Sequence, residues 1–292
     1  MNMEVIESVK SMQKKSDELR AAGQALALVP TMGFLHEGHL ELMRVGKRHS
    51  DTLAISIFVN PTQFGPAEDY DQYPRDTEGD LRKVREVGVD IVFFPRVEEI
   101  YPNGFQTKVE VEKVTQHLCG ISRPHHFGGV TTVVAKLFNI TRPHVAIFGQ
   151  KDYQQLMVIN RMVVDLNMGI QIIGVPTVRE QDGLAMSSRN KYLNPEQRKS
   201  ALYLKKSLDL AAQMFQGGEK DAGAIKDAIV SLIQSHPFTA IDYVALCDPV
   251  TLEPVVTLGE KNLLALAVRV GETRLIDNCV LGEGSNLIIL GT

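Results

Sequence analysis

The sequence has few cysteines and no block of basic residues. Cys119, Cys247 and Cys279 lie far apart and form no CxxC pair, so the usual cysteine patterns of a zinc site or a dithiol redox centre are absent. An odd number of dispersed cysteines fits a reducing compartment, and we expect a cytoplasmic protein. Because 31 Lys and Arg face 35 Asp and Glu, the formal net charge is −4, which argues against a general nucleic-acid binder.

Long apolar runs are also absent. No run approaches the ~18 residues that a membrane-spanning helix needs. The segment MNMEVIESVKSMQKKSDELR contains scattered Lys and Glu and no apolar core of a signal peptide. We therefore expect neither export nor a membrane span.

The pattern that is present indicates an α/β fold. The chain has 292 residues, of which 44% are hydrophobic and 23% charged, which is ordinary for a globular protein of two domains. The expected strands are 25–29, 52–59, 90–94, 144–148 and 170–175, with a short one at 108–111, and the expected helices are 4–22, 39–49, 76–87, 129–141 and 153–167. Since parallel strands need crossover connections and these helices supply them, we predict a doubly wound parallel sheet.

The order of elements changes after this part. Two helical patterns, 195–216 and 221–235, precede strand-like runs at 240–246, 263–270 and 273–281 that have no helices between them. This order predicts a small α+β domain with an antiparallel sheet. The boundary falls near 176–186, so we expect a Rossmann-like domain at 1–178 and a smaller one at 179–292.

Ligands of open α/β sheets bind at the carboxyl ends of the strands, and the first strand runs there into PTMGFLHEGH. His36 and His39 lie three residues apart at a helix start, where they can donate hydrogen bonds to phosphate beside free backbone N–H groups. Gly38 lets a nucleotide approach the backbone. A metal site and a structural cap are the alternatives. The spacing is not HExxH, and the preceding strand and Gly33 favour phosphate contact.

A second polar segment reads AMSSRN over residues 185–190. Its two hydroxyls and its arginine are donors for a triphosphate, since an arginine can bind two oxygens at once. A polar interdomain linker is the alternative, but the histidine pair favours phosphate binding.

The strand 144–148 leads into Gly149-Gln150-Lys151-Asp152. Lys151 can reach a phosphate, and Asp152 can accept from a ribose hydroxyl or cap the following helix.

Two glutamines, Gln63 and Gln155, are neutral donor-acceptors suited to a small hydroxy acid, although isolated glutamines are more often simply on the surface. Neither GxxxxGK[ST] nor GxGxxG occurs, which removes the main support for P-loop and dinucleotide sites.

Together these segments resemble the HxGH nucleotidyltransferase superfamily, which includes the class I aminoacyl-tRNA synthetases, and MSSRN looks like a variant of their KMSKS loop. Within it, the chain resembles the pantothenate synthetase (pantoate–β-alanine ligase) family. PTMGFLHEGH, FVNPTQFGP, YPRD, RPHHFGGV, FGQKDYQQL and VPTVREQDGLAMSSRNKYL look like its signatures, in order. The resemblance covers most of the chain and is strongest over 28–193.

The resemblance implies a ligase of pantothenate biosynthesis that uses ATP and Mg²⁺ to condense (R)-pantoate with β-alanine. Pantoyl adenylate and pyrophosphate would form first; the amine of β-alanine would then displace AMP. The resemblance also implies a homodimer.

The site residues carry over by position. His39, His36 and Lys151 are assigned to catalysis, with His39 as the histidine commonly taken as proton donor. ATP would contact Met32, Gly33, Phe34, Leu35, His36, Glu37, Gly38, His39, Gly149, Gln150, Lys151, Asp152, Val178, Met186, Ser187, Ser188 and Arg189. Gln63 and Gln155 would hold pantoate, with Arg123 and His126 lining the same cavity, and Asp80 is the candidate for orienting Mg²⁺. We also predict that the small C-terminal domain acts as a lid that brings Ser187 to Arg189 onto ATP.

The chain departs from the family pattern at Gln150, where many relatives carry an acid, and we expect little effect because the neighbouring residues are intact. Two other functions stay open: a nucleotidyltransferase that forms no amide, and a nucleotide-sensing protein without catalysis. An RNA-binding role is disfavoured by the acidic balance.

Overall fold

A large sheet forms the centre of the structure, a computed structural model that describes residues 3–66, 68–284 and 286–291. Its strands run in the order β1-β4-β3-β2-β5-β6-β10, and all neighbours are parallel except β6 and β10. The bounds are β1 Glu4–Ile6, β2 Leu26–Thr31, β3 Thr52–Ile57, β4 Ile91–Phe93, β5 Val145–Gly149, β6 Gln171–Val175 and β10 Ile288–Leu290. The predicted doubly wound parallel sheet is confirmed.

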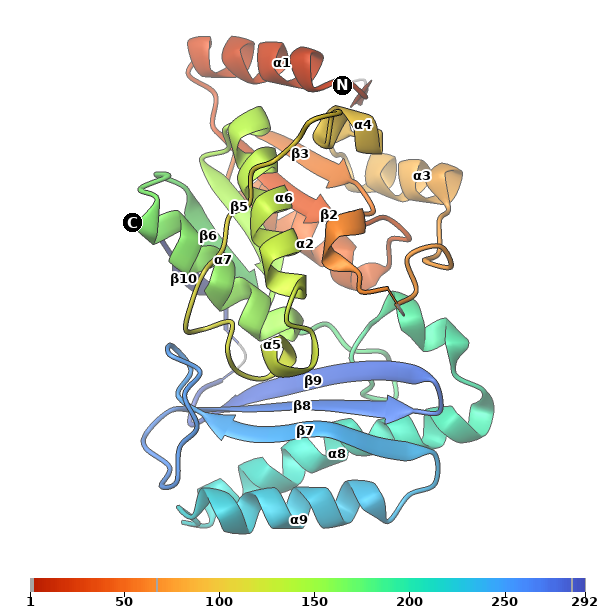
Figure 1. Ribbon diagram of the computed structural model, residues 1–292, viewed down its shortest axis with the longest axis vertical. Coiled ribbons are helices and arrows are strands. Elements are labelled where there is room, and N and C mark those ends of the chain that lie inside the picture. Colours follow the sequence, from red (N-terminus) through yellow and green to blue (C-terminus); the bar gives the residue numbers. More distant parts are fainter. Residues whose placement is uncertain (1–2, 67, 285, 292) are drawn as a thin grey trace.

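Helices cover both faces of this sheet (Figure 1). The helices are α1 Val9–Ala21, α2 Glu37–Arg48, α3 Thr77–Val87, α4 Val97–Ile100, α5 Cys119–Ser122, α6 His126–Thr141 and α7 Tyr153–Asp165, with short 3-10 helices η1 Pro61–Gln63 and η2 Gln150–Asp152. One apolar core joins α1, α6 and α7 to the sheet, and a second joins α2 and α3 to its other face. Strand residues such as Leu28 and Val29 alternate between the two cores, which explains why these strands are apolar throughout.

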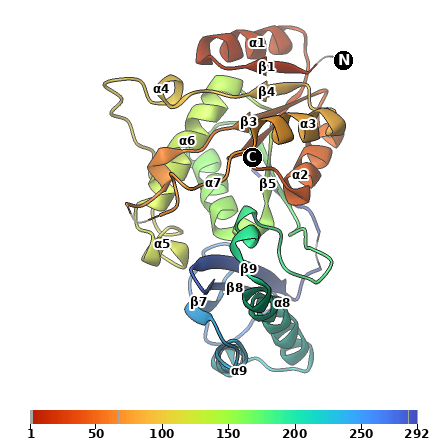
Figure 2. The same ribbon diagram turned by 90° about the vertical axis from the view of Figure 1, so that its right-hand side faces the viewer.

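The C-terminal part is the predicted α+β unit. A 3-10 helix, η3 (Ser188–Tyr192), leads into α8 (Pro195–Gln216) and α9 (Ala222–Gln234), which pack against an antiparallel sheet in the order β7-β8-β9. These strands span Thr239–Cys247, Asn262–Val270 and Thr273–Leu281. The other face of this sheet lies against the large domain (Figure 2) and packs on α7 and on the segment before α6.

Two local predictions were wrong, and one strand was not predicted. Residues 4–6 form a strand paired with β4 rather than the start of a helix, since α1 begins only after Ser8 caps it. Residues 108–111 form no strand, because the backbone of Val109 bonds to the side chains of Thr131 and Thr132 on α6. The sequence reading also missed β10, which returns to the large sheet beside β6.

The division at 178/179 stays a proposal, and any division has to assign β10 to the large sheet. Over the described ranges, no helix has the length and apolar composition that crossing a membrane requires.

Candidate active site

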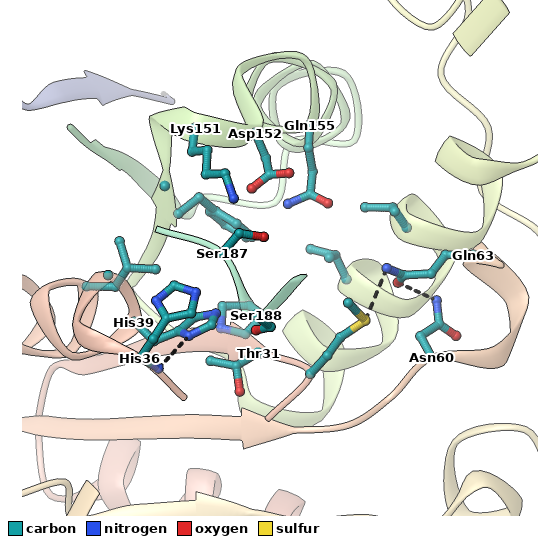
Figure 3. Close-up of a pocket in the computed structure, with 18 of the residues that line it drawn as sticks. Thr31, His36, His39, Asn60, Gln63, Lys151, Asp152, Gln155, Ser187 and Ser188 are labelled. Carbon is teal, nitrogen blue, oxygen red and sulfur yellow. Dashed lines mark hydrogen bonds between the residues drawn. The ribbon is translucent and has the colours of Figure 1, made fainter. Parts of the chain in front are cut away.

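A cleft of about 270 Å³ opens at the carboxyl ends of β2, β3, β5 and β6. It lies where the strand order reverses between β2 and β5, the usual place for a ligand in such sheets. Of the residues expected at the site, it is lined by Met32, His36, Gly38, His39, Gln63, Arg123, His126, Gly149, Lys151, Asp152, Gln155, Val178, Met186, Ser187, Ser188 and Arg189. Figure 3 shows Lys151, Asp152 and Gln155 on one side and the histidines opposite.

Other expected residues stay outside the lining. The part of five of them in ATP binding remains a prediction: Gly33, Phe34, Leu35, Glu37 and Gln150. Asp80, the candidate for Mg²⁺, also lies outside it. Glu37 forms an ion pair with Arg44 on the outer face of α2. Gln150 donates instead to the carbonyl oxygens of Gly174 (2.9 Å) and Asn286 (2.7 Å).

The histidines form a compact pair at the start of α2. The backbone N–H of His36 donates to Nδ1 of His39 (3.3 Å), and the rings lie 4.0 Å apart between centroids (Figure 3). Because Nδ1 of His39 accepts, its proton sits on Nε2, where it is available as a donor. Burial and the nearby Lys151 lower the pKa of His36 to about 4, and burial and His36 hold the pKa of His39 well below its usual value. Both rings are therefore neutral at pH 7.

Asp80 holds the turn before the histidines. It is 1% exposed, and its two carboxylate oxygens accept the backbone N–H groups of Phe34 and Leu35, each at 2.7 Å. This contact stabilises a bend in which Gly33 and Phe34 have φ of 79° and 49°. Asp80 thus positions the backbone of the turn, and each of its oxygens accepts one backbone N–H group.

Lys151 lies in the turn between β5 and α7. Its Nζ donates to the carbonyl oxygen of Met186 (2.8 Å), which links this turn to residues 186–189, the MSSR loop. Burial lowers the pKa of Lys151. The side chain of Asp152 makes no capping hydrogen bond to α7, so the suggested role as a helix cap is not observed. The suggested contact with a ribose hydroxyl stays a prediction.

The MSSR loop reaches across the cleft. Ser188 Oγ donates to the carbonyl oxygen of Phe34 (3.3 Å), which places this loop beside the histidine turn. Arg189 pairs through Nε and Nη2 with both oxygens of Asp69 (3.1 and 2.8 Å). Sequence reasoning missed Asp69, whose only signal was its place in an acidic loop.

A second arginine is paired in the same way. Arg123 binds both carboxylate oxygens of Glu68 at 2.6 Å, and although burial opposes it, this pair holds the pKa of Glu68 below its usual value. Nδ1 of His126 lies 2.9 Å from the carbonyl oxygen of Gln63, and burial lowers the pKa of His126 to about 4. The loop that carries Glu68 and Asp69 thus supplies the counterions of both cleft arginines.

The remaining end of the cleft is less charged. The side chain of Asn60 donates to Oε1 of Gln63 (3.0 Å), and Nε2 of Gln63 lies 3.3 Å from the sulfur of Met32 (Figure 3). An apolar wall lies beside it, formed by Phe58, Val130, Val133, Val134, Leu137 and Phe148. Sequence reasoning missed Asn60 and this wall, because apolar residues at helical spacing look the same in a cleft as in a core.

The described residues contain no group of three or more His, Cys, Asp or Glu arranged to hold a metal ion. The metal alternative for the histidine pair therefore finds no support in this part of the chain.

Comparisons with known proteins agree with the site described above. A sequence profile of the family described as pantoate-beta-alanine ligase matches residues 4–280. The pantothenate synthetase of Geobacter sulfurreducens is 57% identical over 281 residues, covering 96% of this chain and 99% of that protein. A crystal structure of pantothenate synthetase from Thermus thermophilus superposes with a TM-score of 0.89 at 44% identity, covering 95% of this chain and 99% of that one. The pantoate-beta-alanine ligase of Francisella tularensis, crystallised with beta-gamma ATP and beta-alanine, gives a TM-score of 0.79 at 32% identity and covers 98% and 100%.

Proposed function

The chain belongs to the pantoate–β-alanine ligase family, and from this membership we propose that it condenses pantoate with β-alanine while converting ATP to AMP and pyrophosphate. The observation that carries the proposal is the composition of the cleft. Neutral histidine donors, Lys151 and the MSSR loop gather around one part of it, while Gln63, Gln155 and an apolar wall line another. The first part suits a polyphosphate and the second a small branched hydroxy acid.

The first step joins pantoate to the nucleotide. A carboxylate oxygen of pantoate attacks the α-phosphorus of ATP, and the bond to the β,γ-pyrophosphate breaks. Lys151 balances the negative charge that develops on the leaving group, and Nε2–H of His39 donates to a phosphate oxygen. Arg189 joins them after exchanging Asp69 for phosphate, which is a feasible exchange because both are oxygen anions bound in the same bidentate way.

The second step forms the amide. The neutral amine of β-alanine attacks the acyl carbon of pantoyl adenylate and the bond from that carbon to the bridging oxygen breaks. AMP leaves with that oxygen, and the nitrogen releases its extra proton to water. Gln63 and Gln155 orient pantoate through its hydroxyl groups, and the apolar wall accepts its two methyl groups. The adenylate already divides the reaction into two steps, so no covalent bond to the enzyme is needed.

Magnesium remains a prediction. Asp80 was its candidate partner, but both carboxylate oxygens of Asp80 are bound to backbone N–H groups, and the described residues provide no cluster of ligands. These residues therefore form no closed metal site of their own. A magnesium ion held mainly by phosphate oxygens and water stays a prediction, and no step of the mechanism is derived through it.

Isotope transfer tests the two-step reaction. We expect pantoate labelled with ¹⁸O in its carboxylate to pass one label to AMP, since the carboxylate oxygen stays on phosphorus when the amide forms. Formation of ADP, or unlabelled AMP, would contradict the adenylate. Nucleotide transfer without any amide would favour another nucleotidyltransferase, and ATP binding without turnover would favour a sensor.

Oligomeric state, compartment and lid closure are proposals that rest on the family resemblance and composition. We propose a cytoplasmic homodimer; each of the three cysteines lies in the described part of the chain and is unpaired there, which fits a reducing compartment. Sedimentation equilibrium tests the dimer. Small-angle scattering with and without an ATP analogue tests whether the C-terminal domain closes as a lid.

A further inference from the structure

Two adjacent residues of β9, Asp277 and Asn278, reach different loops of the cleft. Successive side chains of a strand point to opposite faces of its sheet. Asp277 shares its face with Leu275 and Leu281, which pack into the core under α8 and α9. Asn278 lies on the other face with Val280, which packs against α7 of the large domain. The two adjacent side chains therefore leave β9 in opposite directions.

Asn278 holds the turn that carries Lys151. Its Nδ2 donates to the backbone carbonyl oxygens of Gln150 (3.0 Å) and Lys151 (2.8 Å). Both partners are acceptors, so only the NH₂ group of the amide can make these contacts. An amide with both hydrogens bound in this way fixes two successive peptide groups at the base of the Lys151 side chain.

Asp277 holds the approach to the facing loop. It is 2% exposed and forms two hydrogen bonds with Arg179, at 2.7 and 2.9 Å. Arg179 also donates to the carbonyl oxygen of Gly183 (3.1 Å), and it pairs with Ala185 as an antiparallel bridge. Asp277 therefore anchors the hairpin that ends directly before the MSSR loop.

These contacts form a closed ring. From Asn278 the ring passes to Lys151, whose Nζ bonds to the carbonyl oxygen of Met186. From Met186 it returns through the hairpin to Arg179 and Asp277, and the backbone N–H of Asn278 donates to Oδ1 of Asp277 (2.9 Å). The ring links the Lys151 turn to residues 186–189 through β9.

We propose that Asn278 is a positioning residue for adenylate formation, acting through the carbonyl groups of Gln150 and Lys151 to set where the Lys151 ammonium meets the pyrophosphate. Asp277 does the same for the opposing loop. This inference rests on the proposed function, because it assigns Lys151 to the pyrophosphate-releasing step.

The test compares the two half-reactions in Asn278 variants of the full chain. Asn278→Asp has the same shape but presents oxygen to two carbonyl oxygens, so it is expected to be worse than Asn278→Ala. We expect kcat for pantoate-dependent pyrophosphate release to fall about tenfold or more in Asn278→Asp, since small misplacements of catalytic groups have effects of this size. Aminolysis of chemically prepared pantoyl adenylate by β-alanine should stay within about twofold of wild type, because pyrophosphate has already left.

Asn139→Asp is the matched control. Its amide also donates to a backbone carbonyl oxygen, that of Ala135 (3.0 Å), but it is exposed on α6 and does not line the cleft. It should leave both half-reactions unchanged. Where Asn278→Asp fails to fold, Asn278→Ala in the same assays decides.

Two results overturn the proposal: pyrophosphate release at the wild-type rate in both Asn278 variants, or an equal loss in both half-reactions, which indicates a structural role only. If the wild-type protein itself releases no pyrophosphate with pantoate, the proposed function fails instead, so the two failures are distinct.

Discussion

His39 accepts the backbone N–H of His36 at Nδ1, and this one contact decides which proton His39 can offer to a ligand. With Nδ1 engaged, the neutral ring carries its hydrogen on Nε2. The lowered pKa values keep both rings neutral, so they act near pH 7 as hydrogen-bond donors rather than as cations. The positive charge in the cleft then comes from Lys151 and the arginines.

Replacing His39 tests this arrangement. We expect His39→Ala to fold normally and to release pyrophosphate about a hundredfold more slowly or worse, because it loses a donor aimed at developing charge. His125→Ala is the control, since His125 is exposed and does not line the cleft. Near-normal pyrophosphate release from His39→Ala would remove His39 from the mechanism.

A substitution at Gly38 should change activity without lowering stability. A Cβ there would lie 2.9 Å from Cε1 and 3.0 Å from Nδ1 of His36, so the ring has to move. Because alanine is the better helix former by about 1 kcal/mol, Gly38→Ala should keep or raise the melting temperature. We expect its kcat to fall about tenfold as His36 is displaced. Gly128→Ala, where a Cβ meets only ordinary contacts, is the matched control. Wild-type turnover in Gly38→Ala would show that the position of His36 is unimportant.

Asp80 distinguishes backbone positioning from metal binding. Asn at this position has one oxygen for two N–H donors, so we expect Asp80→Asn to lower the free energy of unfolding by about 2 kcal/mol and to slow adenylation. Added Mg²⁺ should not restore the rate. Asp76→Asn serves as control, because Asp76 caps α3 and asparagine caps as well. If added Mg²⁺ restored the adenylation rate of Asp80→Asn, the result would indicate that Asp80 binds the metal ion.

Stability should depend on pH through the partly buried His126. The pKa of His126 falls to about 4 on folding, from about 6.5 in an unfolded chain, so the unfolded state binds more protons between these values. The stabilisation is therefore present above about pH 6.5 and is lost as the pH falls toward 4. Over this range the free energy of unfolding of His126→Asn, which can still donate to Gln63, should fall by about 3 kcal/mol less than that of wild type, as measured by urea unfolding. Parallel pH profiles for the two proteins would contradict the assignment.

Much of the fold could be read from the sequence because its elements are long and regular. The strands of the large sheet are apolar runs ending at polar turns, and α8 has the predicted bounds, with Asn194 capping it and Pro195 at its first position. The three-residue strands β1 and β10 are too short to show a period, and each depends on a partner distant in the chain. Residues 108–111 have strand-like alternation, but they bond to side chains of α6 instead.

The candidate site, like the fold, contains parts that the sequence predicts and parts that it does not. Segments such as HEGH and GQKD were visible because each combines unusual residues at the end of a strand. Four contributing residues could not be identified in this way, because a single acid in a loop or a single amide in a strand looks like any other: the counterions Glu68 and Asp69 and the anchors Asp277 and Asn278. Their partners come from other elements of the fold, and only the structure brings them together.

Pyrophosphate release with ATP and pantoate, measured before and after β-alanine is added, tests the central claim most directly. The account predicts release that depends on pantoate alone, with AMP and pantothenate appearing only once β-alanine is present. ATP binding without pantoate-dependent pyrophosphate release would contradict it.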